Sequence, residues 1–329
     1  MKVAVTGAAG HVGGNLVRAL LERRHQVRAI VYQDTRAVDG LAVERVPADV
    51  LDADQVQRAF EGVDWVFHLA AKVSIEGDPD GSVHRTNVLG TRHVVEACLA
   101  RGVKRLVHFS SVHALRNDPY DVPMDEGRPL ADEGHAFAYD LSKAGSEREV
   151  QAGIKRGLDA VIVNPTAILG PSDFKPSRMG QVLVDLHFRR LPALVAGGFD
   201  FVDVRDVAEG AIAAAERGRT GERYLLGNEY RPVRELAGLC RDVAGIRPPR
   251  FTSPLWLARA GAPFAVAWAK VSGTRPLFTE ESLHALAGNP NVSHEKATRE
   301  LGYRPRPLAT SVADTYGWLR EAGLLETKT

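Results

Sequence analysis

Three short groups of residues have the types and spacing expected of a single reaction site. They are the glycine-rich turn Thr6-Gly7-Ala8-Ala9-Gly10-His11-Val12-Gly13, the pair Ser110-Ser111, and the segment Tyr139-Asp140-Leu141-Ser142-Lys143. A glycine turn that opens a helix can bind the phosphates of a dinucleotide. Hydroxyl groups close to an amine can move a proton. In this order, the three groups predict an enzyme that binds a dinucleotide and moves a proton while a hydride is transferred.

The glycine turn comes directly after an expected strand, residues 3–6, and opens an expected helix. Gly7, Gly10 and Gly13 suit a tight turn, a close approach of the backbone to a pyrophosphate, and close packing of the helix on the strand. The phosphates would meet the free N–H groups at the positive end of the helix. The spacing is Gly-x-x-Gly-x-x-Gly, and an ordinary glycine turn is the alternative interpretation.

The second half of the predicted chemistry lies in Tyr139 and Lys143, which are one helical turn apart and share a face. A free tyrosine has a pKa of about 10. A nearby ammonium, helped by a positive nicotinamide ring, should lower that pKa. Tyr139 would then exchange a proton with a carbonyl or alcohol oxygen, which Ser111 would also hydrogen-bond. A surface helix pair without chemistry is the alternative for Tyr139 and Lys143. We expect Ser110 to bond local backbone.

The elements that must position these residues alternate between apolar β-branched runs and amphipathic stretches in the first half of the chain. Strands are predicted at residues 3–6, 27–31, 43–46, 65–69, 106–110 and 160–164. Helices are predicted at residues 12–24, 53–60, 82–101 and 139–156. This rhythm is typical of a doubly wound α/β fold with a parallel (Rossmann) sheet.

After Pro165 the rhythm becomes irregular, and helical stretches such as 204–217 and 293–301 dominate. We therefore predict a dinucleotide-binding domain over residues 1–165 and a smaller, mostly helical substrate domain over residues 166–329. Some segments of the second domain are expected to return to the main sheet.

Composition limits the classes of partner. The chain has 329 residues, 44% of them hydrophobic, and a net charge of +1. This balance does not favour nucleic acid or an anionic membrane as the main partner. Two cysteines, Cys98 and Cys240, fit reduced thiols in a cytoplasmic protein. Met-Lys precedes the first strand directly, so no signal or transit peptide is expected. Histidines and carboxylates lack metal-ligand spacing, so no metal is predicted.

One apolar stretch, residues 260–269, is bracketed by Arg259 and Lys270 and contains Pro263. It is shorter than the roughly 20 residues that a membrane-spanning helix needs. We interpret it as a helix packed over the substrate region, with peripheral membrane contact as the alternative.

The chain resembles an extended short-chain dehydrogenase/reductase over nearly its full length, closest to the branch of dihydroflavonol reductases and 3β-hydroxysteroid dehydrogenases. The matching segments are the glycine turn, Asp49-Val50, His68-Leu69-Ala70-Ala71, Asn87-Val88-Leu89-Gly90-Thr91, Ser110-Ser111, the Tyr139/Lys143 pair and Asn164-Pro165-Thr166.

The resemblance implies roles for these segments. Asp49 and Val50 would face the adenine ring, and Leu69, Ala70 and Ala71 would line the cofactor groove. Asn87 would hold backbone near the cofactor, or would be only a polar residue at a helix start. Lys143 would hold the nicotinamide ribose. The resemblance also favours Ser111 over Ser110 as the acting serine. Further cofactor contacts are expected from His11, Val12, Asn164, Pro165 and Thr166.

Coenzyme preference depends on the end of the second strand, Ile30-Val31-Tyr32-Gln33-Asp34-Thr35-Arg36. An acid here binds the ribose hydroxyls of NAD, whereas an arginine accepts the 2′-phosphate of NADP. Val31 stands where NAD-binding relatives carry the acid, and Tyr32 where NADP-binding relatives carry an arginine. Arg36 and the missing acid favour NADP, and NAD remains open because of Asp34.

The reaction is expected to be hydride transfer between the coenzyme and a ketone, aldehyde or secondary alcohol with a sizeable apolar body. Val112-His113 replaces the acidic pair of dehydratases, Phe199 replaces the arginine of sugar-nucleotide enzymes, and Asn164 replaces an arginine of epimerases. A sugar-nucleotide epimerase with tightly bound NAD is the same-fold alternative, and a cofactor-sensing protein without turnover is another.

Substrate contacts are predicted for three residues beyond the shared site. His113 is close in sequence to Ser111, and Lys175 and Arg178 lie where an anionic substrate group could bind. A packing or solvated position is the alternative for each. By analogy with the family, a homodimer through residues 82–101 and 139–156 is expected.

Overall fold

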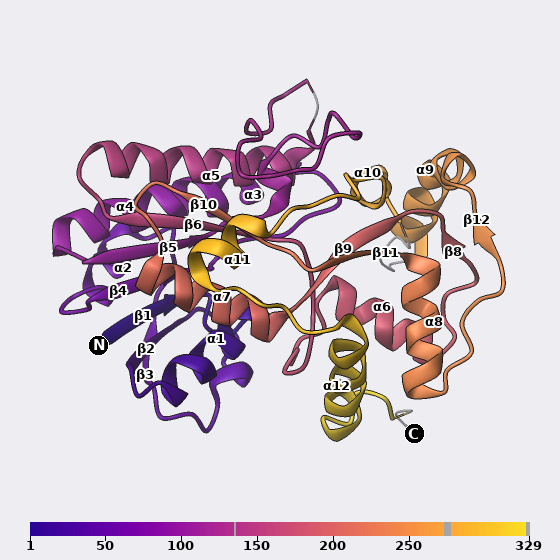
Figure 1. The fold of residues 1–329 in the computed structure, drawn as a ribbon, viewed down its shortest axis with the longest axis horizontal. Helices are drawn as coiled ribbons and strands as arrows, with labels where there is room; N and C mark the ends of the chain where they lie inside the picture. Colours follow the sequence, from indigo (N-terminus) through magenta and orange to yellow (C-terminus); the bar gives the residue numbers. More distant parts are fainter. Residues whose placement is uncertain (135, 273–277, 327–329) are drawn as a thin grey trace.

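A seven-stranded parallel sheet organises the first two thirds of the chain (Figure 1). The computed structural model describes residues 1–134, 136–272 and 278–326. The strand order is β10-β6-β5-β4-β1-β2-β3. The strands are β1 (Lys2–Thr6), β2 (Gln26–Val31), β3 (Glu44–Pro47), β4 (Trp65–His68), β5 (Arg105–Phe109), β6 (Ala160–Pro165) and β10 (Arg223–Leu226). The predicted doubly wound α/β fold is confirmed, because every neighbouring pair is parallel.

Helices cover both faces of this sheet. One face carries α1 (His11–Glu22) packed against α7 (Val204–Arg217), with α11 (Glu295–Leu301) beside α7. The other face carries α2 (Ala53–Ala59), α4 (Gly90–Arg101) and α5 (Ala138–Lys155). The sheet therefore has a separate apolar core on each side, and Cys98 is buried as a free thiol in the second one.

The segment predicted as one helix over residues 82–101 is interrupted. It starts with a short turn, α3 (Ser82–His84), continues as a π-helical turn, η2 (Arg85–Leu89), and becomes α-helical only from Gly90. Single π-helical turns occur often at functional sites. Here the wide turn contains Asn87, whose amide bonds the backbone of another loop instead of facing solvent.

The second half of the chain contributes to the main sheet and also builds a smaller region beside it. β10 is the seventh strand, and the sequence pattern did not predict it. The smaller region has a three-stranded sheet of β7 (Ala167–Leu169), β9 (Gly198–Asp203) and β11 (Glu229–Pro232), and the pair β8 (Leu194–Val195) and β12 (Thr252–Ser253). Its helices are α6 (Arg178–His187), α8 (Val233–Ala244), α9 (Leu255–Ser272), α10 (Glu280–Leu286) and α12 (Leu308–Glu321). Within the described residues, no helix is both long and apolar enough to cross a bilayer.

Candidate active site

The predicted site residues follow the carboxyl ends of six neighbouring strands. Because all strands of the sheet are parallel, these ends lie along one edge. In chain order the segments are Gly7 to Gly13 after β1, Tyr32 after β2, Asp49-Val50 after β3, Leu69-Ala70-Ala71 after β4, Ser110-Ser111 after β5, and Asn164-Pro165-Thr166 at the end of β6. Sheets of this type bind ligands at that edge.

The glycine turn has the shape that a bound pyrophosphate requires. Gly7 has a φ of +68°, and an added Cβ would come within 2.8 Å of the Ala70 nitrogen. A Cβ on Gly13 would come within 2.2 Å of the Gly7 carbonyl oxygen. Gly10 precedes α1, and no side chain caps that helix end. The turn therefore leaves the positive end of α1 open to an anion, and its residues fit a dinucleotide.

Asn87 clamps the loop that follows β4. Its Oδ1 accepts a hydrogen bond from the Lys72 backbone nitrogen at 2.7 Å, and its Nδ2 donates to the Lys72 carbonyl at 3.0 Å. Nδ2 also donates to Ser142 Oγ at 2.8 Å, and that hydroxyl donates to the Tyr139 carbonyl at 2.7 Å. One buried amide thus fixes the loop carrying Ala70 and Ala71 relative to the helix carrying Tyr139.

Tyr139 opens helix α5 beside Ser111. Burial raises the pKa of Tyr139 to about 12, a hydrogen bond with Ser111 lowers it, and the Asp140 charge raises it further. The predicted lowering of the Tyr139 pKa is therefore wrong for the protein chain itself, although that prediction included a bound nicotinamide ring. Desolvation of the phenolate is the dominant effect. At neutral pH the phenol carries its proton and can donate it.

Lys143 is buried one turn further along α5. Its Nζ donates to the Phe109 carbonyl at 2.7 Å, which holds the amine at the end of β5. Burial lowers the pKa of Lys143 to about 8, and the negative charge of Glu147 opposes this change. Lys143 is thus close enough to neutrality for its charge to respond to its neighbours.

The two serines after β5 differ in their surroundings. Ser111 Oγ accepts a hydrogen bond from the His113 nitrogen at 3.2 Å. Ser110 Oγ is buried, and among the described residues it has no hydrogen-bond partner. The expectation that Ser110 bonds local backbone is therefore wrong. A buried hydroxyl without a partner is a group that a bound ligand could satisfy.

Asn164 joins the Ser111 backbone to the buried carboxylate of Glu147. Its Nδ2 donates to the Ser111 carbonyl at 2.9 Å and to Glu147 Oε1 at 2.7 Å. Arg223 donates to Glu147 Oε2 at 2.6 Å from β10. Sequence reasoning placed Asn164 near the site but missed Glu147 and Arg223. The position of Glu147, four residues after Lys143, was the only available signal.

His113 lies against the first two residues of the Tyr139–Lys143 segment. Its Nδ1 is 3.1 Å from Asp140 Oδ1, and its ring meets the Tyr139 ring edge-on at 5.9 Å. A pocket opens beside His113. It is lined from the segment after β5, from β7 and β9, and from the segment after α10 by residues that include Val112, Met124, Ala167, Phe199 and Val292. The geometry thus allows His113 to contact a substrate held at Tyr139.

The loop after β7 folds back over the glycine turn. His11 Nε2 and Asn15 Nδ2 both lie 3.1 Å from the Pro171 carbonyl oxygen. The charge of Lys175 contributes to lowering the pKa of Asp34 at the end of β2. Lys175 therefore lies near the end of β2, whereas Arg178 is at the start of α6. Burial raises the pKa of Glu281 on α10, and the charge of Arg178 opposes this change.

The end of β2 presents polar groups to solvent. Tyr32 is 66% exposed. Arg36 Nε and Nη2 contact the Asp34 carboxylate at 3.0 and 2.6 Å, and this guanidinium is the main reason that the pKa of Asp34 falls to about 2. Across the groove, Asp49 Oδ1 accepts from the Leu51 nitrogen, and Val50 packs against Gly90 at the start of α4.

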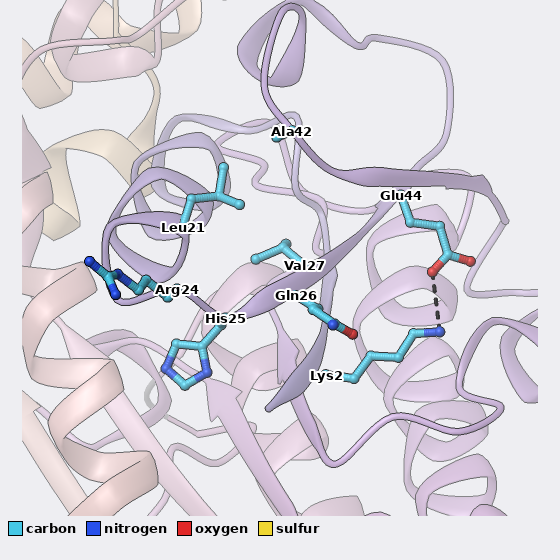
Figure 2. Close-up of a pocket in the computed structure, with 8 residues that line it drawn as sticks. All are labelled: Lys2, Leu21, Arg24, His25, Gln26, Val27, Ala42 and Glu44. Atoms are coloured by element: carbon cyan, nitrogen blue, oxygen red, sulfur yellow. Dashed lines mark ion pairs between the residues drawn. The ribbon is translucent and has the colours of Figure 1, made fainter.

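A second pocket lies far from this edge. Lys2, His25, Gln26, Val27 and Glu44 are among the residues that line it, at the amino ends of β1 to β3 (Figure 2). Since the glycine turn and Tyr139 are at the opposite ends of the strands, this pocket has no part in the site. In the described part of the chain, no group of histidine, cysteine and acidic side chains is arranged to hold a metal ion.

The fold and the site geometry agree with a dinucleotide-binding α/β protein in which Ser111, Tyr139 and Lys143 lie close together at the end of β5. Comparison with known proteins agrees with this class. The profile of the NAD dependent epimerase/dehydratase family matches residues 3–227. Sterol demethylase protein B of Methylococcus capsulatus is 36% identical over 99% of this chain and 100% of its own length.

Two further comparisons cover almost the whole chain. A putative dihydroflavonol 4-reductase of Synechocystis is 33% identical over 98% of this chain and 96% of its own length. The crystal structure of gox2253 superposes with a TM-score of 0.86 at 35% identity, covering 98% of this chain and 99% of that one. The chain belongs to the NAD-dependent epimerase/dehydratase family, the extended short-chain dehydrogenases/reductases. It is an NAD(P)-dependent oxidoreductase.

Proposed function

We propose that this protein transfers a hydride between a nicotinamide coenzyme and a ketone, aldehyde or secondary alcohol with a sizeable apolar body, and that Tyr139 exchanges the proton. The observation that carries the proposal is the arrangement of Ser111, Tyr139 and Lys143 at the end of β5. The coenzyme, when bound, supplies or accepts the hydride. Ser111 orients the substrate oxygen, and Tyr139 donates its proton to that oxygen during reduction.

The protonation state of Tyr139 supports the reductive direction. A phenol with a pKa raised to about 12 holds its proton at neutral pH, as a proton donor must. Lys143 contributes its charge and, by the family resemblance, holds the nicotinamide ribose. The pocket beside His113 has both polar lining residues, such as Asn117 and Asp200, and apolar ones, and the apolar ones, such as Val112 and Phe199, support an apolar substrate body.

The proposed coenzyme is NADP. Arg36 and Lys175 both place positive charge near Asp34, at the end of β2 where a 2′-phosphate would lie. We expect Arg36→Ala and Lys175→Ala each to weaken NADPH binding by about tenfold, the loss of one charge-assisted contact, with little change for NADH. Fluorescence titration of the purified protein measures both. Equal weakening for the two coenzymes would contradict the preference.

The function is tested with Tyr139→Phe. This variant should lose turnover of NADPH with an apolar ketone, yet bind NADPH with the affinity of the parent. Unchanged turnover would end the proposal. NAD that stays bound through purification, with no need for added coenzyme, would instead favour the sugar-nucleotide epimerase. Coenzyme binding without turnover of any carbonyl compound would favour a sensor.

Two further parts of the proposal concern organisation. Residues 1–165 would bind the coenzyme and residues 166–329 the substrate. The homodimer would form through the surface of η2, α4 and α5, and light scattering of the purified protein measures it directly.

A further inference from the structure

Helix α9 has an outer face that is apolar and exposed. Among the described residues, Phe264 (78% exposed) and Trp256 (70%) are the two most exposed large hydrophobic side chains. Leu257 and Ala260 are exposed between them. We call these four residues the α9 outer face. Their spacing places them on one side of the helix.

The opposite side of α9 already packs against the protein. Ala258 and Ala262 are buried in a cluster with Leu283 of α10, and Leu255 packs at its edge. The outer face is therefore not needed to hold α9 in place. Exposed apolar side chains gathered in this way mark a site of interaction.

The charge of the surrounding segment identifies the partner. Residues 243–266 contain Arg247, Arg250 and Arg259 and no aspartate or glutamate, in a chain with 42 basic and 41 acidic side chains. All three arginines are exposed. An apolar helix face with a tryptophan, one arginine on the helix and two in the chain segment before it matches the boundary between headgroups and acyl chains of an anionic bilayer.

We propose that the α9 outer face docks on the surface of an anionic lipid bilayer. Trp256 and Phe264 enter the boundary of the acyl region, and the arginines contact lipid phosphates. The helix lies in the plane of the interface and does not cross the bilayer. In Figure 1, α9 lies at the end of the molecule away from the seven-stranded sheet, so the sheet stays clear of the membrane.

Docking at α9 brings the catalytic edge close to the lipid. α10 packs under α9, and its His284 ring meets the Phe137 ring, two residues before Tyr139, edge-on at 5.1 Å. An apolar molecule leaving the bilayer would thus have a short path to the pocket. The lipid contact itself does not depend on the reaction proposed above.

The test is sedimentation of the full chain with vesicles of phosphatidylcholine alone or with about 30% phosphatidylglycerol, a typical anionic surface. The parent should sediment with the anionic vesicles and stay in solution with the neutral ones. The double variant Trp256→Ser/Phe264→Ser should bind the anionic vesicles at least about tenfold more weakly than the parent. Arg250→Gln/Arg259→Gln should lose binding as well.

The matched control is Tyr120→Ser/Val122→Ser, which removes side chains that are 47% and 48% exposed and lie outside α9. It should sediment like the parent, and unchanged melting temperatures verify that all variants fold. No binding of the parent to anionic vesicles would overturn the proposal, as would equal binding by Trp256→Ser/Phe264→Ser. A parent oligomer that this variant dissociates would show a second copy on the face and overturn it too.

Discussion

Glu147 on α5 and Arg223 on β10 form an ion pair with Nε and Oε2 2.6 Å apart, and the Glu147 side chain is fully buried. The pair joins the helix that carries Tyr139 and Lys143 to the strand that the second half of the chain adds to the main sheet. Asn164 shares the Glu147 carboxylate and holds the Ser111 carbonyl. The position of Ser111 therefore depends on a strand that begins 112 residues later in the chain.

Removal of Arg223 should destabilise the fold strongly. In Arg223→Met the Glu147 carboxylate stays buried without its partner, and breaking such a pair costs about 3–5 kcal/mol of the free energy of unfolding. Urea denaturation measures this cost. The control is Arg92→Met, which breaks the exposed pair of Arg92 with Glu149 on the same helix α5 and should cost at most about 1 kcal/mol. Equal losses of unfolding free energy in the two variants would show that the buried pair contributes no more to stability than the exposed pair.

The Lys143 amine should make stability depend on pH. Its folded pKa of about 8 is below the ordinary value of 10.5, so between these values the unfolded chain binds more protons and stability rises with pH. At about 1.36 kcal/mol per pKa unit, the parent should gain about 2 kcal/mol from pH ~7 to pH ~10 relative to Lys143→Met. Denaturant titrations of both proteins across this range measure the difference. A constant difference would contradict the lowered pKa.

The pH dependence of catalysis should also report the titration of Lys143, whose pKa depends on Glu147. With reduction as the assay, kcat/KM reports on the free enzyme and should fall as the pH rises through about 8, when Lys143 loses its charge. Glu147→Gln removes the charge that raises the Lys143 pKa, so this limb should move to lower pH by about one unit.

The position of the limb does not depend on the amount of folded enzyme, which separates positioning from stability. Glu149→Gln, on the same helix but outside the buried network, should leave the limb where it is. A limb that stays in place in Glu147→Gln would refute the link between Glu147 and Lys143.

Local signals in the sequence predicted most of the fold and the centre of the site. The glycine turn, the strand ends and the Tyr139/Lys143 spacing all depend on residues within one strand or helix turn, so they are readable from the chain. β10 was missed because four residues, Arg223–Leu226, carry too little periodicity, and their place beside β6 is set by tertiary packing.

Charge and burial explain the error at Tyr139. The Tyr139 pKa was predicted to fall because a neighbouring ammonium is visible in the sequence, while the burial that raises it is not. The substrate contact predicted for Lys175 stays a prediction, and its loop folds back toward α1, with Phe174 against Arg18. Contacts of this kind join residues more than 100 positions apart and leave no spacing pattern.

The glycine turn gives the sharpest test of the coenzyme site. In Gly13→Ala the new Cβ would lie 2.2 Å from the Gly7 carbonyl oxygen, which neither backbone can avoid without moving the turn. We expect the variant to fold, as judged by circular dichroism, with NADPH binding weakened by at least about a hundredfold, because the shift would move the N–H groups that we propose face the phosphates. The control is Gly238→Ala on α8, where a Cβ meets nothing within 4 Å. It should bind NADPH like the parent and gain about 0.5–1 kcal/mol in stability, since alanine favours the helix. Normal NADPH affinity in Gly13→Ala would show that the coenzyme phosphates bind elsewhere.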